Sequence, residues 1–252
     1  MLHAKLIGAN SMRIIDISGA LKNEMWCDGP LIPEVKIEKV LRIDEIGFDV
    51  DKITFSSVSG TYFETAAHLF KGRALPIDVP LEKLICNAVV AHIPQKNSLE
   101  HITAQELEKA AHMLNEGEAL LVHTGWDRMW NKNNFTGESP HFSSDGMDWI
   151  IQKKVSTLGA DIPCFDDPIQ SEGLLERFYR LCPESMLLGP VVNLGLVIYQ
   201  KVTLIVLPLK VEGVSAVPCR AIVLEDRDKQ QGACPTIMHL IKNIRVFSGE
   251  TQ

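Results

Sequence analysis

The stretch of residues 55–70, FSSVSGTYFETAAHLF, combines a phenol, a carboxylate and an imidazole at short spacing. Tyr62, Glu64 and His68 are separated by even numbers of residues, so an extended strand would project them from one face. Glu64 and His68 are also four residues apart, and a helical turn would bring them together too. A carboxylate beside an imidazole predicts an acid–base pair. The alternative is structural, a strand and a turn that hold one hydrogen-bonded histidine.

This grouping indicates a mechanism. We expect Glu64 and His68 to activate water or abstract a proton, while the Tyr62 hydroxyl donates to the developing oxyanion. Such a site would work without a metal. The preceding Gly60 allows the backbone to approach a ligand closely. The serine-rich run 56–59 lacks the G-x-S-x-G pattern of a nucleophile elbow, so we expect it to be solvated.

Other polar and aromatic residues are weaker candidates. His123 lies in an apolar, strand-like run, where a buried neutral histidine with one partner is the more common outcome. Trp26, Trp126 and Trp130 are candidates for a pocket wall, although aromatic residues at strand ends are also ordinary packing. Three aspartates lie close to prolines and are expected to form turns and caps: Asp161, Asp166 and Asp167.

Hydrophobic periodicity predicts the elements that would position these residues. Helices are predicted over residues 103–117, 147–158 and 174–181, the first opened by a capping box of Thr103 and Glu106. Strands are predicted over residues 13–17, 36–41, 52–58, 119–124, 191–206 and 219–225. Helices that alternate with strands predict one α/β domain, a mixed β-sheet packed with helices, over residues 1–226. Residues 227–252 are predicted to be a C-terminal extension, and Pro208 implies a sheet edge or a bulge.

Composition excludes several classes of protein. The chain has 252 residues, 46% hydrophobic and 23% charged, which is typical of a folded globular domain. A net charge of -7 disfavours nucleic acid and membrane surfaces as partners. Residues 186–199 are the longest apolar stretch and are too interrupted to span a membrane. With no secretory signal pattern and six scattered cysteines, we expect a cytoplasmic protein with reduced thiols.

The segment that holds the acid–base pair resembles the signature H-x-G-T-H-x-D-x-P-x-H of the cyclase family, metal-dependent hydrolases that include bacterial kynurenine formamidase and isatin hydrolase. Gly60, Thr61 and His68 match this signature, and Glu64 stands in place of the aspartate. Other segments are similar to the family's, in its order, over about residues 13–225: RIIDISGALKNEM, LPIDVPLEKLICNAVVAHIP, ITAQELEKAA, GEALLVHTGWDRMW, LGADIPCFDDP and LPLKVEGVSAVPCRAIVLE. The resemblance implies a kynurenine formamidase/cyclase-like fold. Four residues are candidates for substrate binding: Trp26, Gly60, Thr61 and Trp126.

The chain departs from the signature at the metal ligands. Val58 and Tyr62 occupy the positions of the family's first two histidines; valine has no donor atom, and a protonated phenol binds divalent metals poorly. Glu184 stands where the family has another histidine, and residues 185–211 contain no Asp, Glu or His. Because a catalytic zinc ordinarily takes three protein ligands, we expect no metal cofactor. A zinc or manganese ion, if bound, would be held by Glu64, His68 and Glu184.

The resemblance implies a hydrolase of a small cyclic or acyl amide or ester, with the arylformamidase-like chemistry of tryptophan catabolism, or a related ring closure. A catalytically silent member that binds a small molecule or serves as a subunit is the first alternative. A lyase or isomerase that uses the same pocket is the second. The implied partners are a small-molecule substrate and further copies of the chain, since the family usually forms dimers or tetramers.

Overall fold

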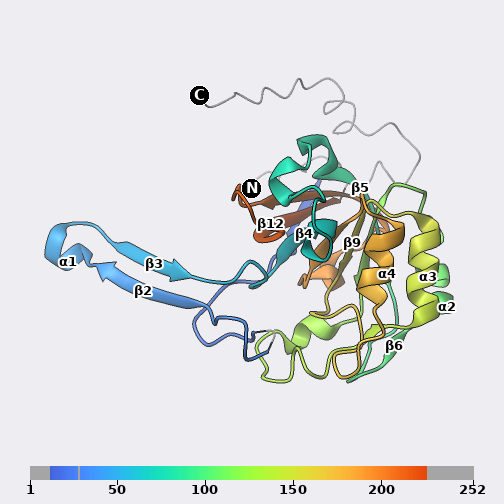
Figure 1. Ribbon diagram of the computed structural model, residues 1–252, viewed down its shortest axis with the longest axis horizontal. Helices are drawn as coiled ribbons and strands as arrows, with labels where there is room; N and C mark the ends of the chain where they lie inside the picture. Colours follow the sequence, from blue (N-terminus) through green and yellow to red (C-terminus); the bar gives the residue numbers. More distant parts are fainter. Residues whose placement is uncertain (1–11, 28, 226–252) are drawn as a thin grey trace, which may run out of the picture.

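The computed structural model describes residues 12–27 and 29–225 (Figure 1). The predicted C-terminal extension and Cys234 lie outside these residues. The five cysteines within them are reduced thiols, as predicted: Cys27, Cys86, Cys164, Cys182 and Cys219. No helix in the described part of the chain is long and apolar enough to cross a membrane.

One mixed sheet organises the molecule, and its strands follow the order β1-β12-β11-β5-β7-β9-β10-β4. The bounds are β1 (Arg13–Asp16), β4 (Tyr62–Thr65), β5 (Ile85–His92), β7 (Ala119–His123), β9 (Thr157–Ala160), β10 (Met186–Gly189), β11 (Lys201–Pro208) and β12 (Ala216–Glu225). The long strand β12 also pairs with β4, through Ala216 opposite Glu64. This extra pairing closes seven strands into a barrel-like ring, with β1 added along β12.

Alternating side chains of the strands supply two separate hydrophobic cores. Residues such as Phe63, Val90 and Leu188 pack together on the inner face of the ring. Their neighbours in sequence point outward, and Leu120 and Leu187 belong to the core beneath the helices. This alternation is expected because successive side chains of a strand face opposite sides of the sheet.

The helices cover the outer core: α2 (Ala104–Ala110), α3 (Ser144–Lys153) and α4 (Leu174–Leu181). They lie side by side along one flank of the barrel (Figure 1). Short 3₁₀ turns connect the strands at Ala66–His68, Pro76–Asp78, Leu81–Lys83, Trp126–Met129 and Leu194–Leu196. A small parallel pair, β6 (His101–Ile102) and β8 (His141–Phe142), joins the segments before α2 and α3.

A hairpin arm of β2 (Lys36–Leu41), the single-turn helix α1 (Ile43–Ile46) and β3 (Val50–Thr54) projects away from the barrel (Figure 1). Every residue of β3 is exposed. The arm also exposes large apolar side chains, among them Val40, Ile43, Phe48 and Ile53.

Some predicted elements are confirmed and others are wrong at their ends. The capping box at Thr103 and the bounds of α4 are as predicted. The predicted helix 103–117 ends at Ala110 and the predicted helix 147–158 ends at Lys153. Leu158 instead lies in β9. The prediction was wrong because the apolar residues of this buried strand happen to continue the helical spacing of the residues before it.

The strand predicted over residues 191–206 is wrong in its first half. Asn193 adopts a left-handed conformation with φ of 63°, and β11 begins only at Lys201. The sequence also failed to indicate β10. Pro208 ends an internal strand, but the pairing of β11 with β5 stops at Ile205. Pro208 therefore pairs with β12 and not with β5, so the sheet edge predicted from this proline is present at that one position.

Candidate functional site

The site is built on β4, which lies between β10 and β12. Phe63 points into the inner core, so the next residue, Glu64, faces outward toward α4. The Glu64 side chain is 2% exposed. The hydroxyl of Tyr179, on α4, donates a hydrogen bond of 2.9 Å to Glu64 Oε1. A buried carboxylate is thus held at one oxygen by a buried phenol.

His68 approaches the other carboxylate oxygen. Its Nε2 lies 3.9 Å from Glu64 Oε2, and its Nδ1 lies 3.4 Å from Ser215 Oγ. The predicted convergence of Glu64 and His68 is therefore present. The predicted common strand face is wrong, because the chain leaves β4 after Thr65 and His68 sits in the 3₁₀ turn Ala66–His68.

Burial sets the protonation of this pair. It raises the pKa of Glu64 to about 7, and the hydrogen bond from Tyr179 opposes that rise. Burial also lowers the pKa of His68. The pKa of Tyr179 is raised well above its ordinary value by burial and by the Glu64 charge, so the phenol remains a donor. Near neutral pH the His68 imidazole is therefore neutral, and the Glu64 carboxyl group is close to half ionised.

Tyr62 lies two residues before Glu64 in β4 and so on the same face of that strand. It is half-buried. Its phenol is close enough to Tyr179 to contribute, after burial and Glu64, to the raised pKa of Tyr179. Tyr62, Glu64 and His68, which were predicted to act together, therefore lie near one another.

Gly60 and Thr61 hold the N-terminal segment in place. Gly60 has φ of +67°, and a Cβ there would lie 2.5 Å from Leu21 Cδ2. The Thr61 hydroxyl donates to the Pro190 carbonyl oxygen at 2.6 Å and accepts from the Gly19 amide at 2.9 Å. The close approach that the glycine permits is thus to another chain segment.

The tryptophans form a packed cluster beyond β7. Trp26 packs edge-on against Trp130 and also against Phe135, with ring centroids 5.2 Å and 4.9 Å away. Trp126 is buried and its indole N–H donates to the Phe135 carbonyl oxygen at 2.9 Å. Trp130 also lines a hollow of about 470 Å³ together with Asp127 and Asn193.

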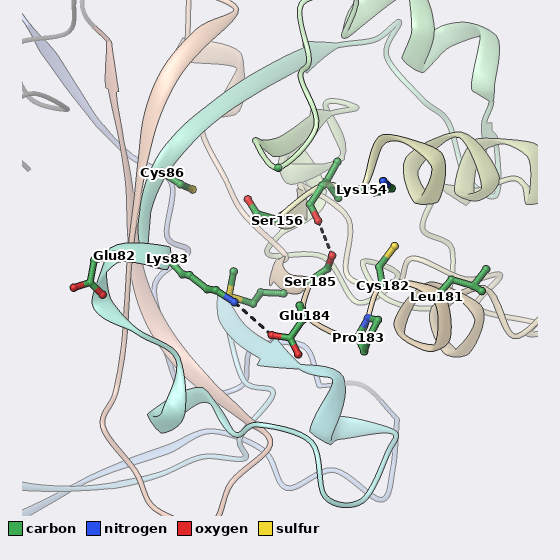
Figure 2. Close-up of a pocket in the computed structure, with 13 residues that line it drawn as sticks. Glu82, Lys83, Cys86, Lys154, Ser156, Leu181, Cys182, Pro183, Glu184 and Ser185 are labelled. Carbon is green, nitrogen blue, oxygen red and sulfur yellow. Dashed lines mark hydrogen bonds and ion pairs between the residues drawn. The ribbon is translucent and has the colours of Figure 1, made fainter. Parts of the chain in front are cut away.

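Glu184 lies apart from the acid–base pair. Its carboxylate is 3.4 Å from Lys83 Nζ and its side chain is 82% exposed. Figure 2 shows both residues at a hollow of about 460 Å³ that also includes Cys86, Cys182 and Ser156. Neither Glu64 nor His68 lines this hollow. The sequence could not indicate this separation, because it depends on where the loop before β10 meets the turn before β5.

A second buried carboxylate lies after β9. Asp161 is wholly buried and accepts hydrogen bonds from the Thr124 amide at 2.9 Å, the Thr124 hydroxyl at 2.7 Å and the Gly125 amide at 2.7 Å. Burial raises its pKa to about 7, and the Thr124 bonds oppose that rise. Asp161 therefore does not form the turn or cap predicted for its own loop; it binds the two amides that follow β7 instead.

His123, Asp127 and Asp161 each place one donor atom within 4.8 Å of the others, a spacing that could hold a metal ion. The same groups have protein partners: His123 Nδ1 lies 3.1 Å from His92 Nδ1, and Asp127 Oδ2 accepts from the Asn193 amide at 2.8 Å. Burial lowers the pKa of His123, as expected for a neutral histidine.

The signature residues do not fit the metal centre that the resemblance implies. Within residues 12–27 and 29–225, only the His123 group brings three His, Cys, Asp or Glu donors within 4.8 Å, so Glu184 does not complete a set with Glu64 and His68. One oxygen of Glu64 is already bound by Tyr179. A catalytic zinc needs three protein ligands, and this site offers two.

Tyr179 and Ser215 were not predicted as site residues. Tyr179 had one usable indication, a phenol on the apolar face of a predicted helix, since a buried tyrosine hydroxyl normally finds a polar partner. Ser215 carried no such pattern, and its contact with His68 spans 147 residues of sequence.

Comparison with known proteins agrees with this architecture. Residues 15–167, more than half of the chain, match the family model described as "Putative cyclase". The kynurenine formamidase of Bacillus thuringiensis (strain Al Hakam) is 29% identical over 214 residues, 83% of this chain and 96% of its own. The kynurenine formamidase of Bacillus anthracis is 28% identical over the same length.

Solved structures share the fold. Isatin hydrolase A from Labrenzia aggregata, bound to benzyl benzoate, superposes with a TM-score of 0.72 at 18% identity, covering 84% of this chain and 93% of its own. A structure described as a potential metal-dependent hydrolase with cyclase activity superposes with a TM-score of 0.69 at 17% identity. The match covers 85% of this chain and 98% of that one. With its sequence match, its closed mixed sheet and its partly kept signature, this chain belongs to the cyclase family.

Proposed function

We propose that this chain hydrolyses a small cyclic or acyl amide or ester, with arylformamidase-like chemistry, through Glu64 and His68. The observation that carries the proposal is the buried Glu64 carboxylate, fixed by Tyr179 at one oxygen and facing the His68 imidazole with the other. Kynurenine formamidases and isatin hydrolases among the relatives and neighbours support this class of substrate.

The geometry supports a division of labour within the pair. His68 is part-exposed and neutral, so it can take the proton of an attacking hydroxyl. Glu64 lies behind it, and as a carboxylate it stabilises the imidazolium that forms. The Tyr62 phenol, on the same strand face, would donate to the oxyanion. We propose that this chemistry proceeds without a metal, because Glu64 and His68 supply two ligands and a catalytic zinc ordinarily takes three.

The test is hydrolysis of N-formylkynurenine and isatin by the purified full chain, followed by a panel of small lactones and cyclic amides. We expect turnover of at least one of these substrates, lost in His68→Ala and kept in Glu108→Gln, which changes an exposed carboxylate on α2. Inactivity on the whole panel combined with a thermal shift on ligand addition would favour the silent binding protein.

We also propose that the chain forms a homo-oligomer through the hairpin arm. Two-stranded hairpins are marginally stable alone, yet this arm exposes 55% of both Phe48 and Ile53. Within the arm Lys39 pairs with Asp49 at 2.8 Å and Lys52 with Glu38 at 3.8 Å, and the exposed apolar side chains are the surface that we propose a partner covers. Light scattering should give a dimer or tetramer at micromolar concentration, and Phe48→Asp should weaken it. A monomer would contradict the proposal.

A further inference from the structure

Ser215 is brought to the acid–base pair by the closure of the barrel. It is the residue immediately before β12, whose first residue, Ala216, pairs with Glu64. The Thr65 amide donates to the Ser215 carbonyl oxygen at 3.3 Å and fixes the backbone of this residue beside the end of β4. The serine is therefore anchored on the strand that carries the carboxylate.

The imidazole of His68 lies between a hydroxyl and a carboxylate. Its Nδ1 is 3.4 Å from Ser215 Oγ, its Nε2 is 3.9 Å from Glu64 Oε2, and Glu64 is oriented in turn by Tyr179. Hydroxyl, imidazole and carboxylate in this order define a serine nucleophile, its base and the acid that orients the base. In unliganded structures such contacts are often longer than in the reacting complex.

Exposure to solvent increases from the carboxylate to the imidazole and the hydroxyl. The carboxylate and the Tyr179 phenol are buried, the His68 side chain is 35% exposed, and Ser215 is half-buried. A substrate carbonyl arriving from solvent would therefore meet the hydroxyl and the imidazole first. Other serines have different roles: Ser56 and Ser59 contact each other at 3.0 Å, and the Ser185 hydroxyl donates to a backbone carbonyl oxygen at 2.6 Å.

We propose that Ser215 is the nucleophile of this site and forms a covalent acyl-enzyme; this rests on the proposed hydrolase function. Ser215 Oγ attacks the acyl carbon while its proton passes to His68 Nδ1. The tetrahedral intermediate collapses, the C–N or C–O bond breaks, and His68 returns the proton to the leaving amine or alcohol. Water then attacks the acyl-serine with His68 as base, which releases the acid and restores the hydroxyl.

The first test is independent of the substrate. The purified full chain is treated with a fluorophosphonate probe, and the modified peptide is located by mass spectrometry. We expect labelling at Ser215, lost in Ser215→Ala, reduced at least about tenfold in Glu64→Gln and unchanged in Ser98→Ala, an exposed matched control. No labelling of the wild-type chain, or labelling that persists in Ser215→Ala, would overturn the nucleophile.

The second test uses whichever substrate the wild-type chain hydrolyses. Ser215→Ala should lose on the order of 1,000-fold in kcat, with an unchanged melting temperature as the control for folding. Wild-type turnover by Ser215→Ala would overturn the covalent route and leave the hydrolase proposal standing, with water as the nucleophile. Labelling at Ser215 without turnover on any substrate would support the nucleophile and contradict the proposed substrate class.

Discussion

Two buried carboxyl groups in this molecule have similarly raised pKa values but different hydrogen-bond donors. Burial raises the pKa of both Glu64 and Asp161 to about 7. Each has an imidazole near one oxygen: His123 Nε2 lies 4.0 Å from Asp161 Oδ2, and His68 Nε2 lies 3.9 Å from Glu64 Oε2. Asp161 accepts hydrogen bonds at both oxygens from Thr124 and Gly125, whereas Glu64 accepts one, from Tyr179, at Oε1. The number of donors on the carboxylate distinguishes them.

The difference separates a structural carboxylate from a reactive one. Asp161, bound at both oxygens by two backbone amides and a hydroxyl, fixes the loop after β7. A carboxylate with one hydrogen bond keeps its second oxygen for an imidazolium beside it, as Glu64 does for His68. A raised pKa alone would not tell them apart; three substitutions, a pH titration and a metal analysis test the distinction.

The largest effect is expected for Glu64→Gln. Glutamine keeps the size of the side chain and can still accept from Tyr179, but it cannot stabilise the imidazolium. Turnover should fall about 100-fold to 10,000-fold with little loss of fold stability. The measurement is kcat per folded molecule, with Glu108→Gln as the matched control. A lowered melting temperature with unchanged turnover would make Glu64 structural.

Asp161→Asn should show the reverse pattern. Asparagine replaces one accepting oxygen of Asp161 with an NH₂ group, which is itself a donor. The N–H or O–H group that this oxygen accepted from would then be buried without an acceptor. We expect a loss of about 2–4 kcal/mol in the free energy of unfolding, measured by denaturant titration. Turnover per folded molecule should change by less than about threefold. A large loss of turnover in fully folded protein would remove the contrast with Glu64.

The pH dependence of stability gives the next effect. The pKa of Glu64 is higher in the folded chain than its ordinary 4.5, so its contribution to stability is fully present below pH 4.5 and is lost as the pH rises through about 7. The free energy of unfolding should therefore fall between pH 5 and 8, by up to about 3 kcal/mol from Glu64. Glu64→Gln should remove the Glu64 share of that fall and leave the share of Asp161, whose pKa is also raised to about 7, and Glu108→Gln should change neither.

Tyr179→Phe should act on the pH profile. The Tyr179 hydrogen bond lowers the pKa of Glu64, so its removal raises that pKa above about 7. The rising limb of kcat/KM against pH should move to higher pH, with a loss of roughly tenfold at pH 7 that is largely recovered at pH 9. A change in melting temperature without a shifted profile would limit Tyr179 to packing.

Metal content is the last test, where we expect little to measure. The purified chain should contain well under one equivalent of zinc, manganese or iron, because Glu64 and His68 supply two donors and the donors of His123, Asp127 and Asp161 have protein partners. Elemental analysis after dialysis provides the measurement. Stoichiometric metal that is lost in His68→Ala would contradict the two-donor argument, and metal lost in His123→Ala would place it at the second carboxylate.

The sequence by itself determined the features that depend on neighbours along the chain. The capping box is an example, since the Thr103 amide donates to Glu106 Oε2 at 3.0 Å and both residues lie within one turn. The bounds of α4 and the meeting of Glu64 with His68 belong to the same class. The ordered series of segments was also enough to indicate the family.

Only the tertiary structure decided what surrounds those residues. Tyr179 reaches Glu64 across 115 residues and Ser215 reaches His68 across 147, and neither contact has a spacing rule. The pairing of β12 with β4 brings Ser215 to the pair, while the loop before β10 carries Glu184 away to Lys83. The physical reason is that backbone geometry fixes contacts within a turn or a strand, whereas closure of the barrel fixes which distant segments share an edge.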